Sequence, residues 1–408
     1  MGVGSGPGDG VGDGRGGVVS GGYGVIFAVA AVATWAFTFA VRRLAVRIGA
    51  VVMPDERRVH AIPTPVGGGV AMYIGFLLAM LAASQMGQFK EVFASSSAPL
   101  GVVLGATVIF AVGLADDLRD MSAPAKLAGQ VLAGSMLELL GVTMFFLQVP
   151  FAGFVALSPD MAPLATVLWV AIMANALNLI DGLDGLAAGI VALAAGSFFV
   201  YGDSLVRAGN VGPENVGPLL AVIACGVCIG FLPHNFHPAR IFMGDAGSML
   251  LGLLMAASTL VVVGQTDNEF SGKTFFFFAP VFIPFFILGV PILDTVFAII
   301  RRAGRRGVAE ADKEHLHHRL VRLGHGHRRS VLILWSWTAV LCGAVLYPTF
   351  TNKGNAVIPA LVAGLGIGLY TLFHPGVRQR PVVGDEAAAP ESPSAAVIPI
   401  TDRKGAAS

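Results

Sequence analysis

Charged residues are scarce in this chain of 408 residues, of which Asp, Glu, Lys and Arg make up only 12%. Soluble domains carry about 25% charged residues, so the composition excludes an ordinary water-soluble protein. Hydrophobic residues account for 55% of the sequence, and the mean hydropathy is +0.75. The chain is therefore expected to be an integral membrane protein.

Cysteine is also rare, and the three cysteines, Cys225, Cys228 and Cys342, all lie in apolar segments. Cys225 and Cys228 form a C-x-x-C pair, but neither a second pair nor polar neighbours accompany it. Zinc and redox sites need such partners. Packing inside the membrane domain is therefore the favoured role of all three.

The two ends of the chain lack long apolar runs. Residues 1–22 are mostly Gly, Ser and Val, without the basic region and cleavage site of a signal peptide, and they are predicted to form a flexible tail. Residues 376–408 are rich in Pro, Ala and charge, which predicts a disordered tail. Residues 23–375 remain as the transmembrane domain.

Eleven apolar stretches approach the roughly 20 residues that a helix needs to cross the hydrocarbon core. They predict an all-α polytopic membrane protein with about eleven transmembrane helices. The stretches are 23–41, 66–85, 99–115, 128–147, 162–178, 186–202, 217–233, 247–264, 275–299, 330–348 and 355–373.

The distribution of Lys and Arg predicts the orientation, because cytoplasmic loops retain positive charge during insertion. With the N-terminus outside, the inner loops and the C-terminal tail hold 21 basic residues against 5 on the other side. We therefore expect the N-terminus out and the C-terminus in. This arrangement puts all nine histidines on the inner side: His60, His234, His237, His315, His317, His318, His325, His327 and His374.

The first inner loop contains Pro63-Thr64-Pro65, followed by three glycines at 67–69. Proline restricts the backbone and glycine permits close approach of other chain segments. The pattern predicts a rigid turn that leads into the second span.

Asp116 and Asp117 are adjacent where the third span leaves the membrane. Charge beside the hydrocarbon is costly and is typical of functional sites. Neighbouring carboxylates repel one another unless a cation holds them, so a divalent ion or a cationic side chain is implied. Lys126, at the start of the fourth span, is one candidate partner. A solvated loop end is the competing interpretation, and it suits Asp120 better than the pair.

The third inner loop is unusually polar for its position between two apolar runs. Asn175, Asn178 and Asp181 are spaced by three, which would place them on one face of a continuing helix. Asp184 extends the series, although Gly182 and Gly185 are expected to break the helix. Core packing does not explain four amide or carboxylate groups within ten residues, so we expect a functional site.

Asp245 stands just before the eighth span, between Gly244 and Gly247. Its neighbourhood is a helix N-terminus, whose free amides can hold a phosphate while the glycines allow close approach. The competing interpretation is an aspartate that caps the helix.

The fifth inner loop holds nine basic residues between 301 and 329, together with His315, His317 and His318. One segment rarely aims adjacent histidines at a single metal ion, so binding of an anion is the simpler interpretation. Anchoring of the arginines to acidic lipid remains an alternative, as does simple solvation of His325 and His327. Carboxylates for a divalent cation, combined with Arg and His for phosphate oxygens, are typical of phosphoryl chemistry.

Four segments in this order resemble the polyprenyl-phosphate sugar-1-phosphate transferases. This is the family of phospho-N-acetylmuramoyl-pentapeptide transferase and undecaprenyl-phosphate N-acetylglucosamine-1-phosphate transferase. The segments are Asp116-Asp117, the stretch 175–185 (NALNLIDGLDG), the stretch 242–248 (FMGDAGS), and the run His315-Leu316-His317-His318 preceded by Asp312.

The resemblance implies that a nucleotide-activated N-acetylhexosamine gives its sugar 1-phosphate to polyprenyl phosphate and releases UMP, with Mg²⁺ as cofactor and Mn²⁺ as an alternative ion. Residues 23–375 would then be a catalytic domain with its active site in the cytoplasmic loops of the bacterial plasma membrane. The implied partners are a UDP-sugar, polyprenyl phosphate and membrane lipid, with a homodimer left open and nucleic acid excluded.

The resemblance also assigns roles to individual residues. Asp245 would bind the metal, and Asp116 and Asp117 would support it or activate the lipid phosphate. Phe242 would stack on uracil. The residues expected to bind substrate are Asn175, Asn178, Asp181, Asp184, Asn235, Phe242, His315, His317, His318 and Lys126.

Two positions depart from the family pattern. Lys313 stands where Arg is frequent in the histidine segment, and Val66 stands where Arg often precedes the glycines. Lysine keeps the positive charge but loses bidentate binding of phosphate. The His-x-His-His spacing and the stretch 60–65 (HAIPTP) favour the N-acetylglucosamine branch, and hence UDP-N-acetylglucosamine as donor for a cell-envelope polymer. UDP-N-acetylmuramoyl-pentapeptide is the alternative donor.

A transporter is the alternative of another class. Transporter sites usually lie near the midplane in broken helices, whereas these polar groups lie at the inner ends of the spans, and no internal repeat is evident.

Overall fold

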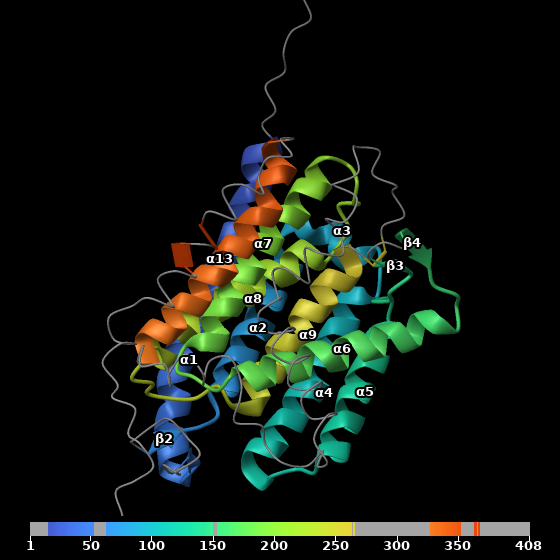
Figure 1. Ribbon diagram of the computed structural model, residues 1–408. Coiled ribbons are helices and arrows are strands. Elements are labelled where there is room, and N and C mark those ends of the chain that lie inside the picture. The colour runs from blue at the N-terminus through green and yellow to red at the C-terminus, as the bar shows by residue number, and fades with distance from the viewer. Residues whose placement is uncertain are drawn as a thin grey trace, which may run out of the picture.

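The computed structural model describes residues 15–52, 63–149, 153–262, 264–265, 327–351, 363–364 and 366–367. Long helices dominate this part of the chain and pack side by side (Figure 1). The helices are α1 (Arg15–Ile48), α2 (Gly68–Gln85), α3 (Lys90–Ala94), α4 (Ala98–Arg119), α5 (Ala123–Leu139), α6 (Met161–Ile180), α7 (Leu186–Arg207), α8 (Gly217–Asn235), α9 (Gly244–Val262) and α13 (His327–Thr351), with a short 3-10 helix, η1, at Gly87–Phe89.

Seven of the described helices are long and apolar enough to cross a membrane: α1 from Gly21 onward, α2, α4, α6, α7, α8 and α9. They confirm an all-α polytopic membrane protein. Helix α13 coincides with the expected span 330–348, whereas the expected spans 275–299 and 355–373 fall largely outside the described residues. The total of eleven spans and the orientation therefore stay predictions.

Two boundaries differ from the sequence prediction. Helix α1 begins at Arg15, so the last part of the expected flexible tail is helical. Helix α5 begins at Ala123 and ends at Leu139, where the apolar pattern predicted 128–147. Its early start has a physical reason: Pro124 suits the first turn of a helix, and Lys126 is tolerated there because its charge meets carboxylates from other helices.

A turn and irregular chain follow α5, and a small β-hairpin begins at the end of the segment predicted as the fourth span. Strand β3 (Phe146–Val149) pairs antiparallel with β4 (Gly153–Ala156). Gly141, with φ 94°, helps to end the helical path before this hairpin. In Figure 1 the hairpin lies near α3, at the end of the bundle away from β2. The sequence prediction assigned the first residues of this hairpin to the fourth span, because they are apolar as well.

Helix α9 lies at the centre of the bundle and packs against α2, α4, α6 and α8. Small residues allow these close crossings. A Cβ atom added at Gly69 of α2 would clash with the Gly247 nitrogen, and one at Gly113 of α4 would lie 2.5 Å from the Ala246 Cα. The first turn of α9 is therefore held between the backbones of α2 and α4.

The first and fourth inner loops are joined by main-chain hydrogen bonds. Strand β2 (Thr64–Pro65) pairs with β1 (Val51–Val52), and the Pro65 carbonyl accepts a bond from the Phe242 amide at 2.9 Å. The Gly68 amide donates to the Phe242 carbonyl at 2.9 Å, and the Gly69 amide donates to the Met243 carbonyl at 2.8 Å. The turn expected before the second span is present, and it fixes the chain just ahead of Asp245.

Candidate active site

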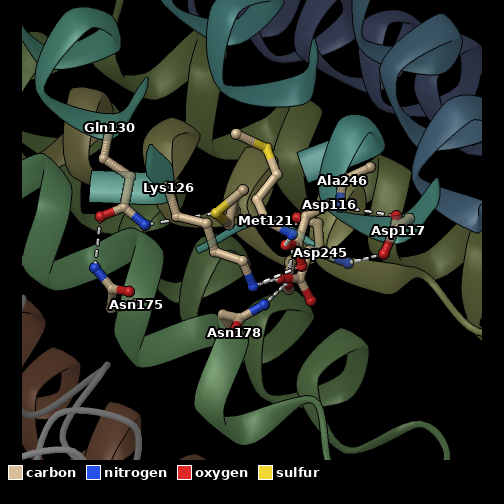
Figure 2. A network of polar contacts seen from close by, with 11 residues as sticks. Asp116, Asp117, Met121, Lys126, Gln130, Asn175, Asn178, Asp245 and Ala246 are labelled. Atoms are coloured by element: carbon tan, nitrogen blue, oxygen red, sulfur yellow. Dashed lines mark hydrogen bonds and ion pairs between the residues drawn. The ribbon is translucent and has the colours of Figure 1, made fainter. Parts of the chain in front are cut away.

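Four helix ends meet at one end of the bundle and bring together polar residues from distant parts of the sequence (Figure 2). The C-terminal ends of α4 and α6 and the N-terminal ends of α5 and α9 contribute the side chains. The sequence prediction that separate spans deliver acidic and amide groups to one place is confirmed for the described residues Asp116, Asp117, Lys126, Asn178 and Asp245.

Lys126 bridges two carboxylates at the middle of this group. Its Nζ atom lies 2.5 Å from Asp116 Oδ2 and 2.7 Å from Asp245 Oδ2. The three residues come from α5, α4 and α9, and Figure 2 shows their side chains converging. We call Asp116, Lys126 and Asp245 the acid–lysine cluster. The predicted pairing of Lys126 with the Asp116-Asp117 carboxylates is confirmed at Asp116.

Asp117 makes different contacts from its neighbour. Its Oδ1 accepts a hydrogen bond from the Asp245 amide at 2.8 Å, and its Oδ2 accepts one from the Ala246 amide at 3.2 Å. These amides belong to the first turn of α9, where no intrahelical acceptors exist. Gly244 has φ 69°, and a Cβ there would clash with Asp117 Oδ2. Asp117 thus caps α9 from another helix and positions Asp245.

The alternative interpretation of Asp245 as the cap of its own helix is wrong. Asp245 lies inside the first turn of α9, which begins at Gly244. Its side chain faces Lys126, and the capping carboxylate is that of Asp117. The Asp245 carboxylate is therefore not used to satisfy the helix and pairs instead with Lys126.

The two asparagines of the third inner loop lie on α6, which continues to Ile180 as the spacing predicted. Asn178 donates to Ser248 Oγ on α9 at 3.1 Å. Asn175 donates to Gln130 Oε1 on α5 at 2.6 Å. These contacts connect α6 to α5 and α9, two of the three helices that carry the acid–lysine cluster. Gln130 is buried and lies one helical turn after Lys126, a spacing that would have identified it in the sequence.

Asp181 follows directly after α6 and begins the turn between α6 and α7. Burial raises the pKa of Asp181 to about 8, and the negative charges of Asp245 and Asp117 add to this effect. Asp181 therefore lies near enough to Asp245 and Asp117 for their charges to act on it. Crowded carboxylates of this kind are stabilised by a bound cation.

A second group of polar residues joins the third inner loop to the fourth loop and to α13. Asp184 Oδ2 lies 2.7 Å from His237 Nδ1 and accepts the Ala239 amide at 3.0 Å. The Asp184 amide donates to His327 Nε2 at 2.8 Å. The rings of His237 and His327 stack with centroids 4.2 Å apart. We call Asp184, His237 and His327 the Asp–His cluster.

The Asp–His cluster has the composition of a metal site, since its potential ligand atoms lie within 4.8 Å of one another. Its geometry is unsuitable, however. Imidazole lone pairs lie in the ring plane, and the two rings are nearly parallel, at 20°, so they do not converge on one ion about 2.0–2.1 Å from each nitrogen. His327 Nε2 is also occupied by the Asp184 amide. The cluster instead ties three segments of the chain together.

Asn235 reinforces the same junction. Its Oδ1 accepts the Gly185 amide at 3.0 Å, and its Nδ2 donates to the Ile241 carbonyl at 3.1 Å. Asn235 is buried, and its polar side-chain atoms are thus used within the protein. His327, for which solvation was one interpretation, is largely buried as well, with 11% of its side chain exposed.

The acid–lysine cluster fits a magnesium ion better than the Asp–His cluster does. Mg²⁺ prefers oxygen ligands and usually binds one or two carboxylates together with water and substrate phosphates. Asp116 and Asp245 face one another across a single cation, Lys126, and both retain partial exposure. The carboxylates therefore provide the type of ligand and the access that such an ion requires.

The remaining predicted residues are placed less completely. The main chain of Phe242 joins the first inner loop, as described above, and its side chain is partly buried. His315, His317 and His318 lie outside the described residues. Sequence reasoning missed the contributions of Gln130, His237 and the Ala239 amide.

Comparisons with known proteins found a matching family and several named relatives. The family described as glycosyl transferase family 4 matches residues 99–263, which include both clusters except His327. The chain is 39% identical over 361 residues to a decaprenyl-phosphate N-acetylglucosaminephosphotransferase of Mycolicibacterium smegmatis, covering 86% of this chain and 88% of that protein.

Two further relatives represent both branches of the family. A probable undecaprenyl-phosphate N-acetylglucosaminyl 1-phosphate transferase of Bacillus subtilis is 37% identical, with coverage of 76% of this chain and 80% of that protein. A phospho-N-acetylmuramoyl-pentapeptide-transferase of Mycobacterium avium is 32% identical, with coverage of 69% and 82%. The chain therefore belongs to the polyprenyl-phosphate N-acetylhexosamine-1-phosphate transferases, a family of polytopic membrane enzymes.

Proposed function

We propose that this protein transfers N-acetylglucosamine 1-phosphate from UDP-N-acetylglucosamine to a polyprenyl phosphate. The products are polyprenyl diphosphate-N-acetylglucosamine and UMP. The observation that carries the proposal is the convergence of Asp116, Lys126 and Asp245 from three helices at one end of the bundle. The choice of donor is supported by relatives of 37–39% identity whose names specify N-acetylglucosamine, against 32% for a muramoyl-pentapeptide enzyme.

In this reaction an oxygen of the lipid phosphate attacks the phosphorus that carries the sugar. A new phosphorus–oxygen bond forms, and the bond between that phosphorus and the oxygen of the departing UMP breaks. A phosphate monoester is mostly ionised at neutral pH, because its second pKa is about 6. The nucleophile thus needs little deprotonation, and catalysis depends on bringing two anions together.

The side chains supply the charges and the positions for this encounter. Asp245, with Asp116, would hold Mg²⁺, or Mn²⁺ in its place, and the bound ion would neutralise negative charge on the phosphates. Lys126 supplies a second positive charge. Asp117 holds the first turn of α9, so that Asp245 is directed to the centre of the site. Asn178 keeps α6 against α9 through Ser248.

The position of the site supports a lipid acceptor on the cytoplasmic side of the plasma membrane. The acid–lysine cluster lies at the ends of membrane-spanning helices, where a lipid phosphate group would be found. The excess of Lys and Arg in the same set of loops favours the cytoplasmic side. The lipid-linked sugar would then enter the assembly of a cell-envelope polymer.

The test is an assay of purified protein with polyprenyl phosphate and radiolabelled donors. We expect labelled lipid and UMP from UDP-N-acetylglucosamine, loss of product with a chelator, and recovery with Mg²⁺. A matched control is Asp160→Asn, because Asp160 is an exposed carboxylate at the other end of α6. Transfer only from UDP-N-acetylmuramoyl-pentapeptide would refute the proposed donor, and absence of transfer from either donor would refute the proposed function.

A further inference from the structure

The ammonium group of Lys126 occupies the space between the two carboxylates that are best suited to hold a metal ion. It lies 2.5 Å from Asp116 Oδ2 and 2.7 Å from Asp245 Oδ2. The side chain of Lys126 is 27% exposed, and those of Asp116 and Asp245 are 11% and 24% exposed. The three charges are therefore only partly screened by water.

Three other carboxylate oxygens of this region have partners in the main chain. Asp116 Oδ1 accepts the Met121 amide at 2.6 Å. Both oxygens of Asp117 accept amides from the first turn of α9. The two oxygens that face one another across the cluster, Asp116 Oδ2 and Asp245 Oδ2, are the two that Lys126 bridges.

A divalent ion bound to these same oxygens would need the place of the ammonium group. Magnesium lies about 2.0–2.1 Å from its oxygen ligands, so an ion between the two carboxylates would be within a few ångströms of Lys126 Nζ. Two cations at such a separation repel strongly in a partly buried site. Occupation by the ion and bridging by Lys126 therefore exclude one another.

We infer that Lys126 is a displaceable counter-ion of the metal site. Without the ion, its ammonium group keeps Asp116 and Asp245 together; when the ion binds, Lys126 leaves Asp245 and its charge becomes available to an anionic reactant. The lysine side chain suits this exchange because its charge is compact and its stem is flexible. The inference rests on the proposed function only in requiring that a divalent cation binds at these carboxylates.

The experiment measures binding of Mn²⁺ to the purified full-length protein, without nucleotide or lipid, from the electron paramagnetic resonance signal of the free ion. Lys126→Met removes the bridging charge but keeps a stem of similar length. Arg119→Met is the matched control, because it removes one positive charge from the exposed end of α4. Lys126→Arg keeps the charge.

We expect Lys126→Met to bind Mn²⁺ about tenfold more tightly than the unaltered protein, which corresponds to about 1.4 kcal/mol. Arg119→Met should stay within about twofold, because an exposed charge is screened. Lys126→Arg should bind no more tightly than the unaltered protein. Equal or weaker binding by Lys126→Met would overturn the inference, as would an equal gain in Arg119→Met.

Thermal melting gives a second measurement that does not depend on activity. In EDTA, Lys126→Met should melt at a lower temperature than the unaltered protein, because Asp116 and Asp245 then repel one another. Saturating Mn²⁺ should raise its melting temperature more than that of the unaltered protein. Equal increases in the two proteins would overturn the inference.

The two proposals fail in different ways. The proposed function fails if no sugar 1-phosphate is transferred. The role of Lys126 fails, with transfer intact, if Mn²⁺ binds equally well with and without the lysine.

Discussion

The acid–lysine cluster and the Asp–His cluster lie at neighbouring helix ends but use their polar groups differently. In the first, one lysine holds Asp116 and Asp245 together. Asp117 and the buried Asp181 lie close by, so the single positive charge of Lys126 balances only part of the negative charge. In the second, Asp184 accepts His237 and the Ala239 amide while its own amide donates to His327. A satisfied polar network makes a structure rigid, whereas an incompletely compensated one is suited to a ligand.

This difference separates the expected effects of mutation. Loss of a carboxylate from the acid–lysine cluster should reduce activity with little loss of stability, because it also removes repulsion between like charges. Changes in the Asp–His cluster should reduce stability first, because they weaken or remove hydrogen bonds that join three segments of the chain. The contrast would be contradicted by an Asp–His variant that lost activity at unchanged stability, or by a carboxylate variant of the acid–lysine cluster that lost stability at unchanged activity.

The largest effect is expected for Asp245→Asn. The substitution removes the charge that faces Lys126 while preserving the size of the side chain. Transfer of sugar 1-phosphate should fall about 100- to 1,000-fold, as for other groups that stabilise charge in a transition state. The melting temperature in EDTA should change little, because the lost ion pair is offset by weaker repulsion from Asp116. Parallel assays of kcat and melting, with Asp160→Asn as control, test both statements.

The next effect concerns the packing that holds the acid–lysine cluster in place. Gly113→Ala would put a Cβ atom 2.5 Å from the Ala246 Cα and displace the first turn of α9. Forced overpacking of this kind costs about 1–3 kcal/mol, so the folded yield and the melting temperature should both fall. Gly343→Ala in α13 is the control, since nothing lies within 4 Å of its added Cβ. Equal melting of the two variants would contradict the described crossing of α4 and α9.

A smaller loss of stability is expected for Asp184→Asn. The contacts of His237 and the Ala239 amide both go to Asp184 Oδ2, which the amide oxygen of asparagine can replace. The replacement carries no negative charge, so both hydrogen bonds lose their charge-assisted strength. The cost should be about 1–3 kcal/mol, measured by denaturant unfolding in mild detergent. Activity per folded molecule should fall by less than in Asp245→Asn. If Asp184→Asn instead lost all activity with unchanged stability, Asp184 would belong to the catalytic machinery rather than to a structural junction.

Local patterns in the sequence predicted much of the site. The spacing of Asn175 and Asn178 predicted a common helical face, and α6 presents these residues to α5 and α9. The crowding of Asp116 and Asp117 predicted a cationic partner, and Lys126 provides it. These predictions succeeded because helical periodicity and the cost of uncompensated charge are both local properties.

Long-range contacts were not predictable in the same way. Asp117 caps a helix whose first turn lies 128 positions later, and Asp184 meets His327 across 143 positions. Such pairs depend on how helices cross, which small residues such as Gly113 and Gly69 permit. The hairpin β3–β4 was missed for another reason, because its short apolar run resembled part of a span.

The smallest expected effect is on the dependence of stability on pH. Measuring it tests whether His327 is a neutral hydrogen-bond acceptor within the Asp–His cluster. Burial lowers the pKa of His327, while the charge of Asp184 opposes this effect and His237 adds to it. The folded protein therefore resists protonation of His327 more than the unfolded chain does. As the pH falls below about 6.5, the unfolded chain takes up a proton first, so His327 makes the protein less stable until the pH reaches the lowered pKa.

His327→Gln separates this effect from other titrations, because glutamine can accept the Asp184 amide through its side-chain oxygen but has no ionisable group. We expect the unaltered protein to lose about 1–2 °C of melting temperature relative to His327→Gln between about pH 7.5 and about pH 5.5, a shift that corresponds to less than about 1 kcal/mol. Melting curves of both proteins across this range provide the measurement. If the difference in melting temperature between the two proteins does not change with pH, His327 has the same pKa in the folded and unfolded protein. That result would contradict a neutral His327 that accepts the Asp184 amide.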